Sequence, residues 1–173
     1  MISVDLDSTL NTLLYDWIAH INKMGETVIS VNDIDQYDHP LLLKHLDYVN
    51  NPDLYDILDV LDGGYDFIAA LQEFDEVQIV TVTPDHHMET KTRFVKKHFP
   101  SIKLIHVKDC KLEHTKDTIL IDDNLDNIKK HVDSGNGLGF VFTNGEYKYN
   151  ETYDYPTGGY DDAIEFVKGL YNG

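Results

Sequence analysis

The stretch Ile2-Ser3-Val4-Asp5-Leu6-Asp7-Ser8-Thr9 decides how this sequence folds. Its start predicts a short buried strand, because apolar Ile2 and Val4 precede an abrupt change to polar residues. Asp5 and Asp7 follow that strand directly. Residues two positions apart lie on the same side of an extended segment, so the two carboxylates are expected to point the same way. The stretch therefore predicts a strand that delivers a pair of carboxylates to one edge of a sheet.

Strands and helices alternate along the rest of the chain. Apolar and β-branched runs predict strands, and apolar residues at helical spacing predict helices. The predicted strands cover residues 77–82, 103–107, 118–121 and 140–142, and the predicted helices cover 11–24, 65–74, 88–98, 125–132 and 160–170. The Gly-rich residues 135–139 predict a turn, and residues 144–159 predict an irregular loop. This order predicts an α/β fold, a three-layer sandwich with helices on both faces of a central parallel sheet.

The segment after the first helix has a different pattern. Short helices are predicted at 41–48 and 54–61, with a turn at Asn50-Asn51-Pro52 between them. We interpret residues 15–74 as a small helical insert in an α/β core, which then comprises residues 1–14 and 75–173. Together they are expected to form one compact unit.

The composition limits the partners of this chain. It has 173 residues, of which 14 are basic and 31 acidic, so the formal net charge is −17. Such a charge repels nucleic acid and anionic membranes, so we expect no stable binding to either. A phosphorylated substrate would meet the same repulsion. A phosphate site in this chain therefore needs a local cation, a lysine or a helix N-terminus.

Cysteine usage and hydropathy indicate the compartment. Cys110 is the one cysteine, which excludes an intrachain disulfide and favours a reducing compartment. The sequence has no 18-residue apolar run, and the motif at Asp5 leaves no room for a signal peptide before it. We expect the protein in the cytoplasm of a bacterial or phage-infected cell.

Polar residues also follow the other predicted strands. In parallel α/β sheets, ligands bind at the carboxyl ends of the strands. The residues at these ends are Thr81 and Thr83, Lys108 and Lys111, and Asp122 and Asp123. Carboxylates, hydroxyls and an ammonium group at one edge suit phosphoryl transfer, which depends on positioning and charge neutralisation. One carboxylate can act as nucleophile, another as general acid/base, and several can hold Mg²⁺.

These residues resemble a known superfamily. Val4-Asp5-Leu6-Asp7-Ser8-Thr9 resembles the first motif of the haloacid dehalogenase superfamily of phosphatases, and Ile79-Val80-Thr81 resembles the second. Lys111 is similar to the third motif, and Ile121-Asp122-Asp123-Asn124 to the fourth. The motifs occur in the order of the superfamily and span most of the chain. The resemblance implies a Rossmann-like haloacid dehalogenase fold and a magnesium-dependent phosphomonoesterase that forms an aspartyl-phosphate.

A narrower resemblance is to the 5′(3′)-deoxyribonucleotidase branch, which includes the cytosolic type-C 5′-nucleotidases and their bacterial and phage relatives. It rests on Trp17-Ile18-x-x-Ile21-Asn22, on Val31-Asn32-Asp33-Ile34-x-x-Tyr37-Asp38 and on Leu120-Ile121-Asp122-Asp123-Asn124. The helical insert after the first motif also resembles the small cap of that branch, which implies a helical cap inserted into the catalytic core. The resemblance further implies a deoxynucleoside monophosphate as substrate. Two alternatives stay open: a phosphatase of another small phosphomonoester (a sugar phosphate, a phosphoamino acid or a 3′-phosphate end), and a non-catalytic acidic binding protein. A homodimer is also an open possibility.

The resemblance implies a role for each carboxylate. Asp5 would be the nucleophile and a metal ligand. Asp7 would be the general acid/base and would bind the metal through its backbone carbonyl. Of the acidic pair Asp122 and Asp123, the second is favoured as a further Mg²⁺ ligand.

The phosphate-binding residues follow in the same way. Thr81 would bind the phosphate, and Lys111 would neutralise the phosphoryl group. Thr83 is an alternative to Thr81, and Lys108 an alternative to Lys111, because the spacing departs from the family pattern at both places.

Other residues have weaker signals. Trp17, Tyr37 and Tyr48 are candidates for contact with a nucleotide base, although packing is the better explanation for Trp17. His86 and His87 are adjacent but lack the spacing of a metal-binding helix, so we expect both at the surface.

Overall fold

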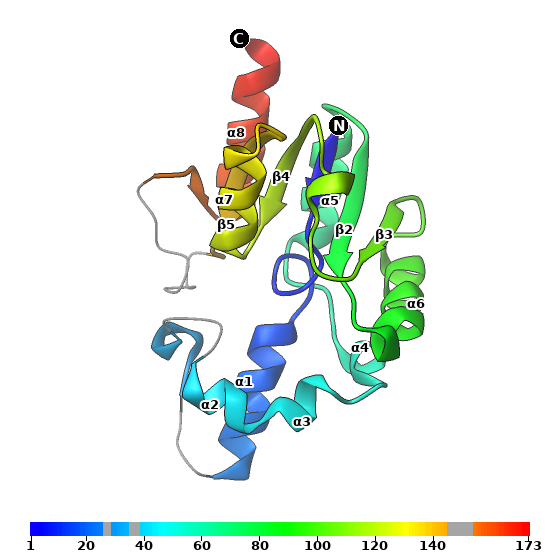
Figure 1. The fold of residues 1–173 in the computed structure, drawn as a ribbon, viewed down its shortest axis with the longest axis vertical. Coiled ribbons are helices and arrows are strands. Elements are labelled where there is room, and N and C mark those ends of the chain that lie inside the picture. Colours follow the sequence, from blue (N-terminus) through cyan, green and yellow to red (C-terminus); the bar gives the residue numbers. More distant parts are fainter. Residues whose placement is uncertain (26–28, 35–38, 145–153) are drawn as a thin grey trace.

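The computed structural model describes residues 1–25, 29–34, 39–144 and 154–173. Its centre is a parallel sheet, which confirms the predicted fold class (Figure 1). The strands are β1 (Ile2–Val4), β2 (Val77–Val82), β3 (Lys103–Val107), β4 (Thr118–Asp122), β5 (Gly137–Phe142) and β6 (Thr157–Gly158). Their order across the sheet is β3-β2-β1-β4-β5-β6.

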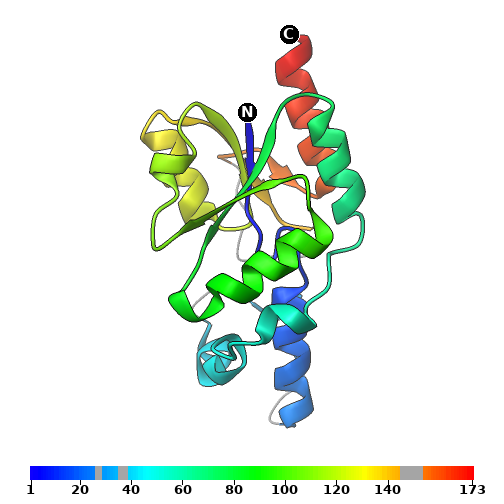
Figure 2. The same cartoon turned by 90° about the vertical axis from the view of Figure 1, so that its right-hand side faces the viewer.

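Helices cover both faces of this sheet. The α-helices are α1 (Leu13–Met24), α2 (Pro40–Lys44), α3 (Leu46–Val49), α4 (Leu54–Ile57), α5 (Gly64–Gln72), α6 (Met88–His98), α7 (Leu125–Asp133) and α8 (Tyr160–Asn172). Three short 3₁₀ helices are η1 (Val31–Asp33), η2 (Asp85–His87) and η3 (Leu112–His114). Helices α5 and α8 lie side by side on one face, and α7 packs against β4 and β5 on the other (Figure 2).

The alternation of side chains along the strands divides the core between the two faces. Ile121 and Phe140 belong to the main hydrophobic cluster, on the face that α5 and α8 cover. Their strand neighbours Leu120 and Val141 pack instead with Ile128 of α7 in a second cluster. Because successive side chains of a strand point to opposite faces, apolar runs without alternation are what a sheet buried on both faces requires.

Strand β1 lies at the centre of the sheet, and its residues are fully buried. Val4 pairs with Ile79 of β2 on one side and with Ile121 of β4 on the other. The chain order reverses between β1 and β4, and such a switch point is where open α/β sheets bind ligands. The amide of Asp5 donates to the carbonyl of Ile121 at 2.9 Å, so the first acidic residue lies directly beside β4.

Helix α1 and the short helices α2–α4 lie beyond the carboxyl ends of the strands (Figure 1). Helix α5 follows them in sequence and lies within the predicted insert, but it contacts α8 and β2. Its buried residues Phe67, Ile68 and Leu71 join the main hydrophobic cluster. Of the residues 15–74, those of α1–α4 are therefore the ones placed over the end of the sheet.

Two local predictions are wrong at the C-terminal side of the sheet. The predicted turn at 135–139 contains the start of β5, which begins at Gly137. The predicted loop at 144–159 contains β6. Residues 145–153 of that loop lie outside the described residues. The glycines of β5 mark close packing instead of a turn. A Cβ on Gly137 would lie 2.0 Å from the carbonyl oxygen of Thr118, and one on Gly139 would lie 2.6 Å from Ile128.

Across the parts of the chain that the structure describes, no helix combines the length and apolar character needed to cross a membrane.

Substitution of Gly137 tests the close approach of β5 to β4. We expect Gly137→Ala to lower the free energy of unfolding by about 2–4 kcal/mol, because the new methyl group overlaps backbone and cannot move aside. Gly169→Ala is the matched control, since Gly169 lies in α8 with open space around it. There alanine should raise the free energy of unfolding by about 0.5–1 kcal/mol through helix propensity. Urea denaturation of both variants measures the difference, and equal stabilities would contradict the packing argument.

Candidate active site

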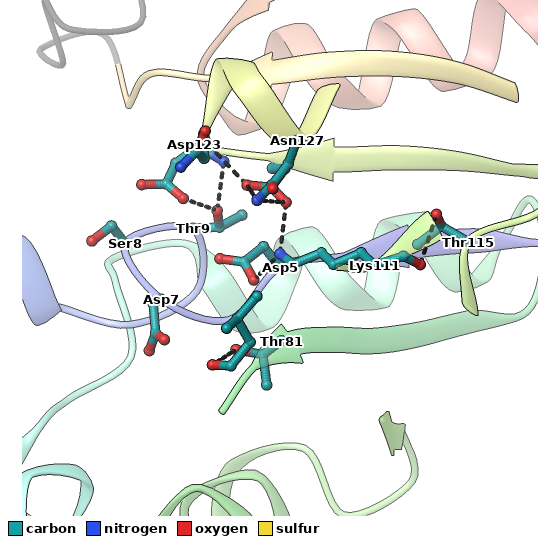
Figure 3. Close-up of polar contacts among 12 residues, drawn as sticks. Asp5, Asp7, Ser8, Thr9, Thr81, Lys111, Thr115, Asp123 and Asn127 are labelled. Carbon is teal, nitrogen blue, oxygen red and sulfur yellow. Dashed lines mark hydrogen bonds and ion pairs between the residues drawn. The ribbon is translucent and has the colours of Figure 1, made fainter. Parts of the chain in front are cut away.

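Three buried carboxylates meet at the ends of β1 and β4. Asp5, Asp122 and Asp123 each offer an oxygen, and these oxygens lie within 4.8 Å of one another. Figure 3 shows Asp5 and Asp123 converging from the two strands, with Asp7 on the other side of the loop that follows β1. The register of β1 against β4 accounts for this convergence, because it brings the first and fourth motifs to the same level of the sheet.

Lys111 lies within this group of carboxylates. Its ammonium is bonded to Asp5 Oδ1 and to Asp122 Oδ2, the latter at 2.6 Å. The hydroxyl of Thr115 donates to the carbonyl of Lys111 at 3.2 Å and holds the lysine backbone at the start of η3. Lys108 is exposed at the surface. Of the two predicted lysines, Lys111 is the one that the fold brings to Asp5.

The two acids of the fourth motif have different surroundings. Both oxygens of Asp122 accept hydrogen bonds, from the amide of Asn124 at 2.9 Å, from Asn127 Nδ2 at 3.0 and 3.2 Å, and from Lys111. Asp123 receives a longer bond, 3.4 Å, from the hydroxyl of Thr9. Asp122 is thus bonded to Lys111 and Asn127, while Asp123 contacts Thr9 and offers an oxygen to the group that it forms with Asp5 and Asp122.

Asp7 is surrounded by three side-chain donors. Lys91 Nζ lies 2.6 Å from Asp7 Oδ2, while Asn11 Nδ2 and the hydroxyl of Tyr55 donate to Oδ1 at 3.0 and 2.9 Å. Lys91 of α6 is fully buried, and Tyr55 comes from α4. The sequence reasoning missed all three of these residues.

One sequence signal could have identified Lys91. It lies three and four positions before Phe94 and Val95, whose buried side chains form the core-facing side of α6. Positions three and four apart share a helix face. A lysine on that side has to be paired when it is buried, since an unpaired buried charge is strongly unfavourable.

The hydroxyls of Thr81 and Thr83 point to different partners. Thr81 Oγ1 accepts a bond from Lys91 Nζ at 3.0 Å and so joins the group around Asp7. Thr83 Oγ1 lies 2.9 Å from His106 Nδ1 of β3 and 3.3 Å from the carbonyl of Thr81. The structure therefore links Thr81 to Asp7 through Lys91, and links Thr83 to the edge strand β3.

Burial controls the ionisation of the nucleophile candidate. Burial raises the pKa of Asp5 to about 7 against the opposing effect of Lys111, and the charges of Asp122 and Asp7 add to the rise. Burial alone would lower the pKa of Lys111, but the carboxylates of Asp122 and Asp5 outweigh it and raise that pKa. Lys111 therefore stays an ammonium ion. Its single positive charge is smaller than the summed negative charge of the ionised carboxylates around it.

The balance is different at Asp7. Burial would raise the pKa of Asp7, but the charge of Lys91 and the hydrogen bonds from Lys91, Asn11 and Tyr55 together lower it. Burial raises the pKa of Tyr55, helped by the charge of Asp7, so the phenol remains a neutral donor. Asp7 is therefore held as a carboxylate.

The donor set of this site fits a divalent cation. Asp5, Asp7, Asp122 and Asp123 carry four negative charges when ionised, and the two ammonium groups of Lys91 and Lys111 leave an excess of two. Mg²⁺ prefers oxygen ligands, including one or two carboxylates. The excess charge and the clustered oxygens are therefore what a magnesium site requires.

The remaining sequence candidates lie outside this group. Trp17 is buried and donates to the carbonyl of His45 at 3.0 Å, and Tyr48 stacks on His20. Tyr37 falls outside the described residues. The expectation that His87 is at the surface is wrong: it is buried, and its Nε2 lies 2.6 Å from the carbonyl of Val49, because η2 packs against the short helices.

Asn11 shapes the loop that carries the aspartates. Its Oδ1 accepts from the amides of Ser8 and Leu13 at 3.1 and 3.2 Å, while its Nδ2 donates to Asp7. Ser8 has a φ of 56°, in the left-handed region that favours glycine. The bonds from Asn11 therefore hold a strained turn in place.

We expect Asn11→Ala to lower the free energy of unfolding by about 2–3 kcal/mol, because three side-chain hydrogen bonds of buried Asn11 are lost at roughly 1 kcal/mol each. Asn51→Ala is the control, since exposed Asn51 makes one comparable bond, to the amide of Asp53 at 3.1 Å. It should cost less than about 1 kcal/mol. Chemical denaturation measures the free energy of unfolding of both variants. Equal effects of the two substitutions would show that the loop keeps its conformation without the Asn11 side chain.

Comparison with known proteins identifies the family. The sequence profile of the family described as 5′ nucleotidase, deoxy (pyrimidine), cytosolic type C matches residues 1–155. The 5′(3′)-deoxyribonucleotidase of Bacillus subtilis (strain 168) is 30% identical over 139 residues, which cover 75% of this chain and 78% of the relative.

Solved structures agree on the fold. A haloacid dehalogenase-like hydrolase from Burkholderia xenovorans LB400 superimposes with a TM-score of 0.60 at 14% identity, over 97% of this chain and 96% of its own. A haloacid dehalogenase-type hydrolase from Bacillus subtilis, bound to magnesium, gives a TM-score of 0.58 at 15% identity, over 96% and 97% of the two chains. The profile match, the identity to the relative and the shared fold show that this chain belongs to the cytosolic type C 5′-nucleotidase family and is a phosphoric monoester hydrolase.

Proposed function

We propose that this protein is a magnesium-dependent phosphatase that removes the phosphate of deoxynucleoside monophosphates through an aspartyl-phosphate. The observation that carries the proposal is the position of Asp5 and Asp7 at the end of β1, each bonded to its own buried lysine. Such a pair provides one carboxylate for attack and another for proton transfer, with a cation next to each.

In the first step, an oxygen of Asp5 forms a bond to phosphorus while the bond from phosphorus to the ester oxygen breaks. The leaving oxygen takes a proton from Asp7 and departs as an alcohol. In the second step, water gives a proton to Asp7 and attacks phosphorus, which releases inorganic phosphate and restores the Asp5 carboxylate. The balance of atoms requires Asp7 to act once as acid and once as base.

Asp7 needs a proton at the start of this cycle, although the free protein holds it as a carboxylate. We infer that binding of the substrate phosphate raises the pKa of Asp7, so that Asp7 takes up this proton. A phosphate anion near Lys91 competes with Asp7 for the ammonium, and its negative charge raises the proton affinity of Asp7. The bond from Lys91 to Thr81 supports a phosphate position near both residues.

Asp5 and Asp123 would hold Mg²⁺ by their carboxylates, and Asp7 by its backbone carbonyl. When bound, the ion supplies positive charge that stabilises the phosphoryl oxygens in the transition state. Asp122 and Asn127 hold Lys111 against Asp5 through the bonds described above. Lys111 then neutralises the phosphoryl group and keeps the nucleophile in line.

The substrate class rests on the family and on the cap. The Bacillus subtilis relative is a 5′(3′)-deoxyribonucleotidase, and we extend that substrate to this chain. We propose that α1–α4 form the cap over the site, since Tyr55 of α4 contacts Asp7 directly. We also propose that the enzyme acts in the cytoplasm, a compartment that its single cysteine favours.

Replacement of the two aspartates tests the mechanism. We expect Asp5→Asn to lower kcat for deoxynucleoside monophosphates by at least about 10³-fold, and Asp7→Asn by roughly 10²–10⁴-fold. Exposed Asp133 lies at the C-terminal end of α7, away from the fourth motif, so Asp133→Asn should keep full activity.

The assay is phosphate release from deoxynucleotides, ribonucleotides and sugar phosphates, with and without Mg²⁺, which tests both the reaction and the substrate preference. Equal turnover by wild type and Asp5→Asn would refute the mechanism, and preference for a sugar phosphate would refute the substrate.

The acidic pair of the fourth motif can be separated by its metal dependence. We expect Asp123→Asn to raise the Mg²⁺ concentration for half-maximal activity by about 10–100-fold, because it removes a ligand. Asp122→Asn should mainly lower kcat, since it loosens Lys111 and leaves the ligands in place. Magnesium titrations of both variants distinguish the roles, and the opposite pattern would make Asp122 the ligand.

A further inference from the structure

A second group of metal-binding side chains lies among the cap helices. His20 is on α1, His45 is at the junction of α2 and α3, and Asp47 is in the first turn of α3. One ligand atom from each lies within 4.8 Å of the others. We propose that these residues form a binding site for a transition-metal ion of the Zn²⁺ type, which ties α1 to the α2–α3 junction.

The two imidazoles are held in place by packing around them. The indole of Trp17, one turn before His20 on α1, donates to the backbone carbonyl of His45 at 3.0 Å. The ring of Tyr48 stacks on His20 with centroids 4.8 Å apart, and His20 and His45 meet edge to face at 6.1 Å. Side chains that are positioned before the ion arrives lose little freedom on binding, which favours affinity.

The geometry is near that of a metal centre. Tetrahedral Zn²⁺ with ligand bonds near 2.0–2.1 Å separates its ligand atoms by about 3.3 Å. The ligand atoms here lie within 4.8 Å of one another, so the contraction needed is at most about 1.5 Å, which side-chain rotations can provide. Asp47 is exposed and free to rotate toward the imidazoles. Three protein ligands leave the fourth position to water.

His20 gives a separate reason to expect an ion. Its Nε2 atom is buried and has no hydrogen-bond partner among the residues that the structure describes. Buried polar atoms in folded proteins nearly always have a partner, so each exception needs an explanation. The lone pair of a neutral imidazole nitrogen is a ligand for Zn²⁺, and a bound ion would satisfy this atom.

The chemistry separates this site from the catalytic one. Imidazole nitrogens favour Zn²⁺ and its neighbours, whereas the all-oxygen group around Asp5 favours Mg²⁺. His20 lies about 10 Å along α1 from the start of the helix, so its metal would be remote from the reacting phosphate. A bound ion there would stabilise the cap and would take no part in the chemistry.

The test measures Zn²⁺ binding in excess Mg²⁺, which occupies the acidic site. Wild type freed of transition metals and kept in excess Mg²⁺ is titrated with Zn²⁺ against a chromogenic chelator. A parallel titration with Co²⁺ follows the intense visible absorption of tetrahedral coordination. We expect one equivalent of Zn²⁺ to bind and to raise the Tm. His20→Gln and Asp47→Asn should each weaken the Zn²⁺ affinity by at least tenfold and abolish the Tm shift.

His114→Gln is the matched control, because His114 is exposed and outside both metal-binding groups. It should bind Zn²⁺ as wild type does. Asp47→Asn changes an exposed residue, so it should fold and keep its magnesium-dependent phosphatase activity, which separates loss of the ion from loss of the fold. Failure of wild type to bind Zn²⁺, or equal affinities in wild type, His20→Gln and Asp47→Asn, would overturn the proposal and leave the phosphatase mechanism untouched.

Discussion

The crowding of carboxylates at the end of β1 is the constraint on which the rest of this structure depends. Asp5, Asp122 and Asp123 lie together with almost no exposure to water, in a chain whose net charge is already −17. Like charges in a low-dielectric interior repel strongly, so the arrangement stands only with buried cations beside it. The chain supplies Lys91 and Lys111, and both ammonium groups are satisfied by two or more acceptors.

The sheet topology explains how residues so far apart in sequence reach one place. The reversal of chain order between β1 and β4 leaves room at their carboxyl ends, and the parallel register sets Asp5 next to the end of β4. Helix α6 packs against β3 and brings Lys91 to Thr81 and Val82 at the end of β2. The same helix packs against α4, and its Arg93 forms an exposed ion pair with Asp56 of α4 at 2.5 Å. One helix thus serves both the charge balance and the position of Tyr55 over Asp7.

The loop after β1 couples stability to function. Its residue Ser8 adopts a left-handed conformation that side chains disfavour, and Asn11 compensates with bonds to the amides of Ser8 and Leu13. The amide group of Asn11 also bonds Asp7, so the residue that holds the turn orients the acid/base candidate. Strain of this kind is found at functional sites, where the surrounding structure enforces it.

The sequence by itself determined the parallel α/β class, most of the strands and helices, and the aspartates and Lys111 at the strand ends, because hydrophobic periodicity and strand-end motifs are local signals. It did not reveal Lys91, Tyr55 or Asn127, the two-residue strand β6, or the packing of α5 on α8. Those features depend on which distant segments meet. Strand β6 forms only through its pairing with Val141 and Phe142 of β5. Lys91 belongs to the site because the fold buries it next to Asp7, where the two opposite charges stabilise each other. Only the tertiary structure decides such pairings, since burial and proximity, not residue type, give these side chains their roles.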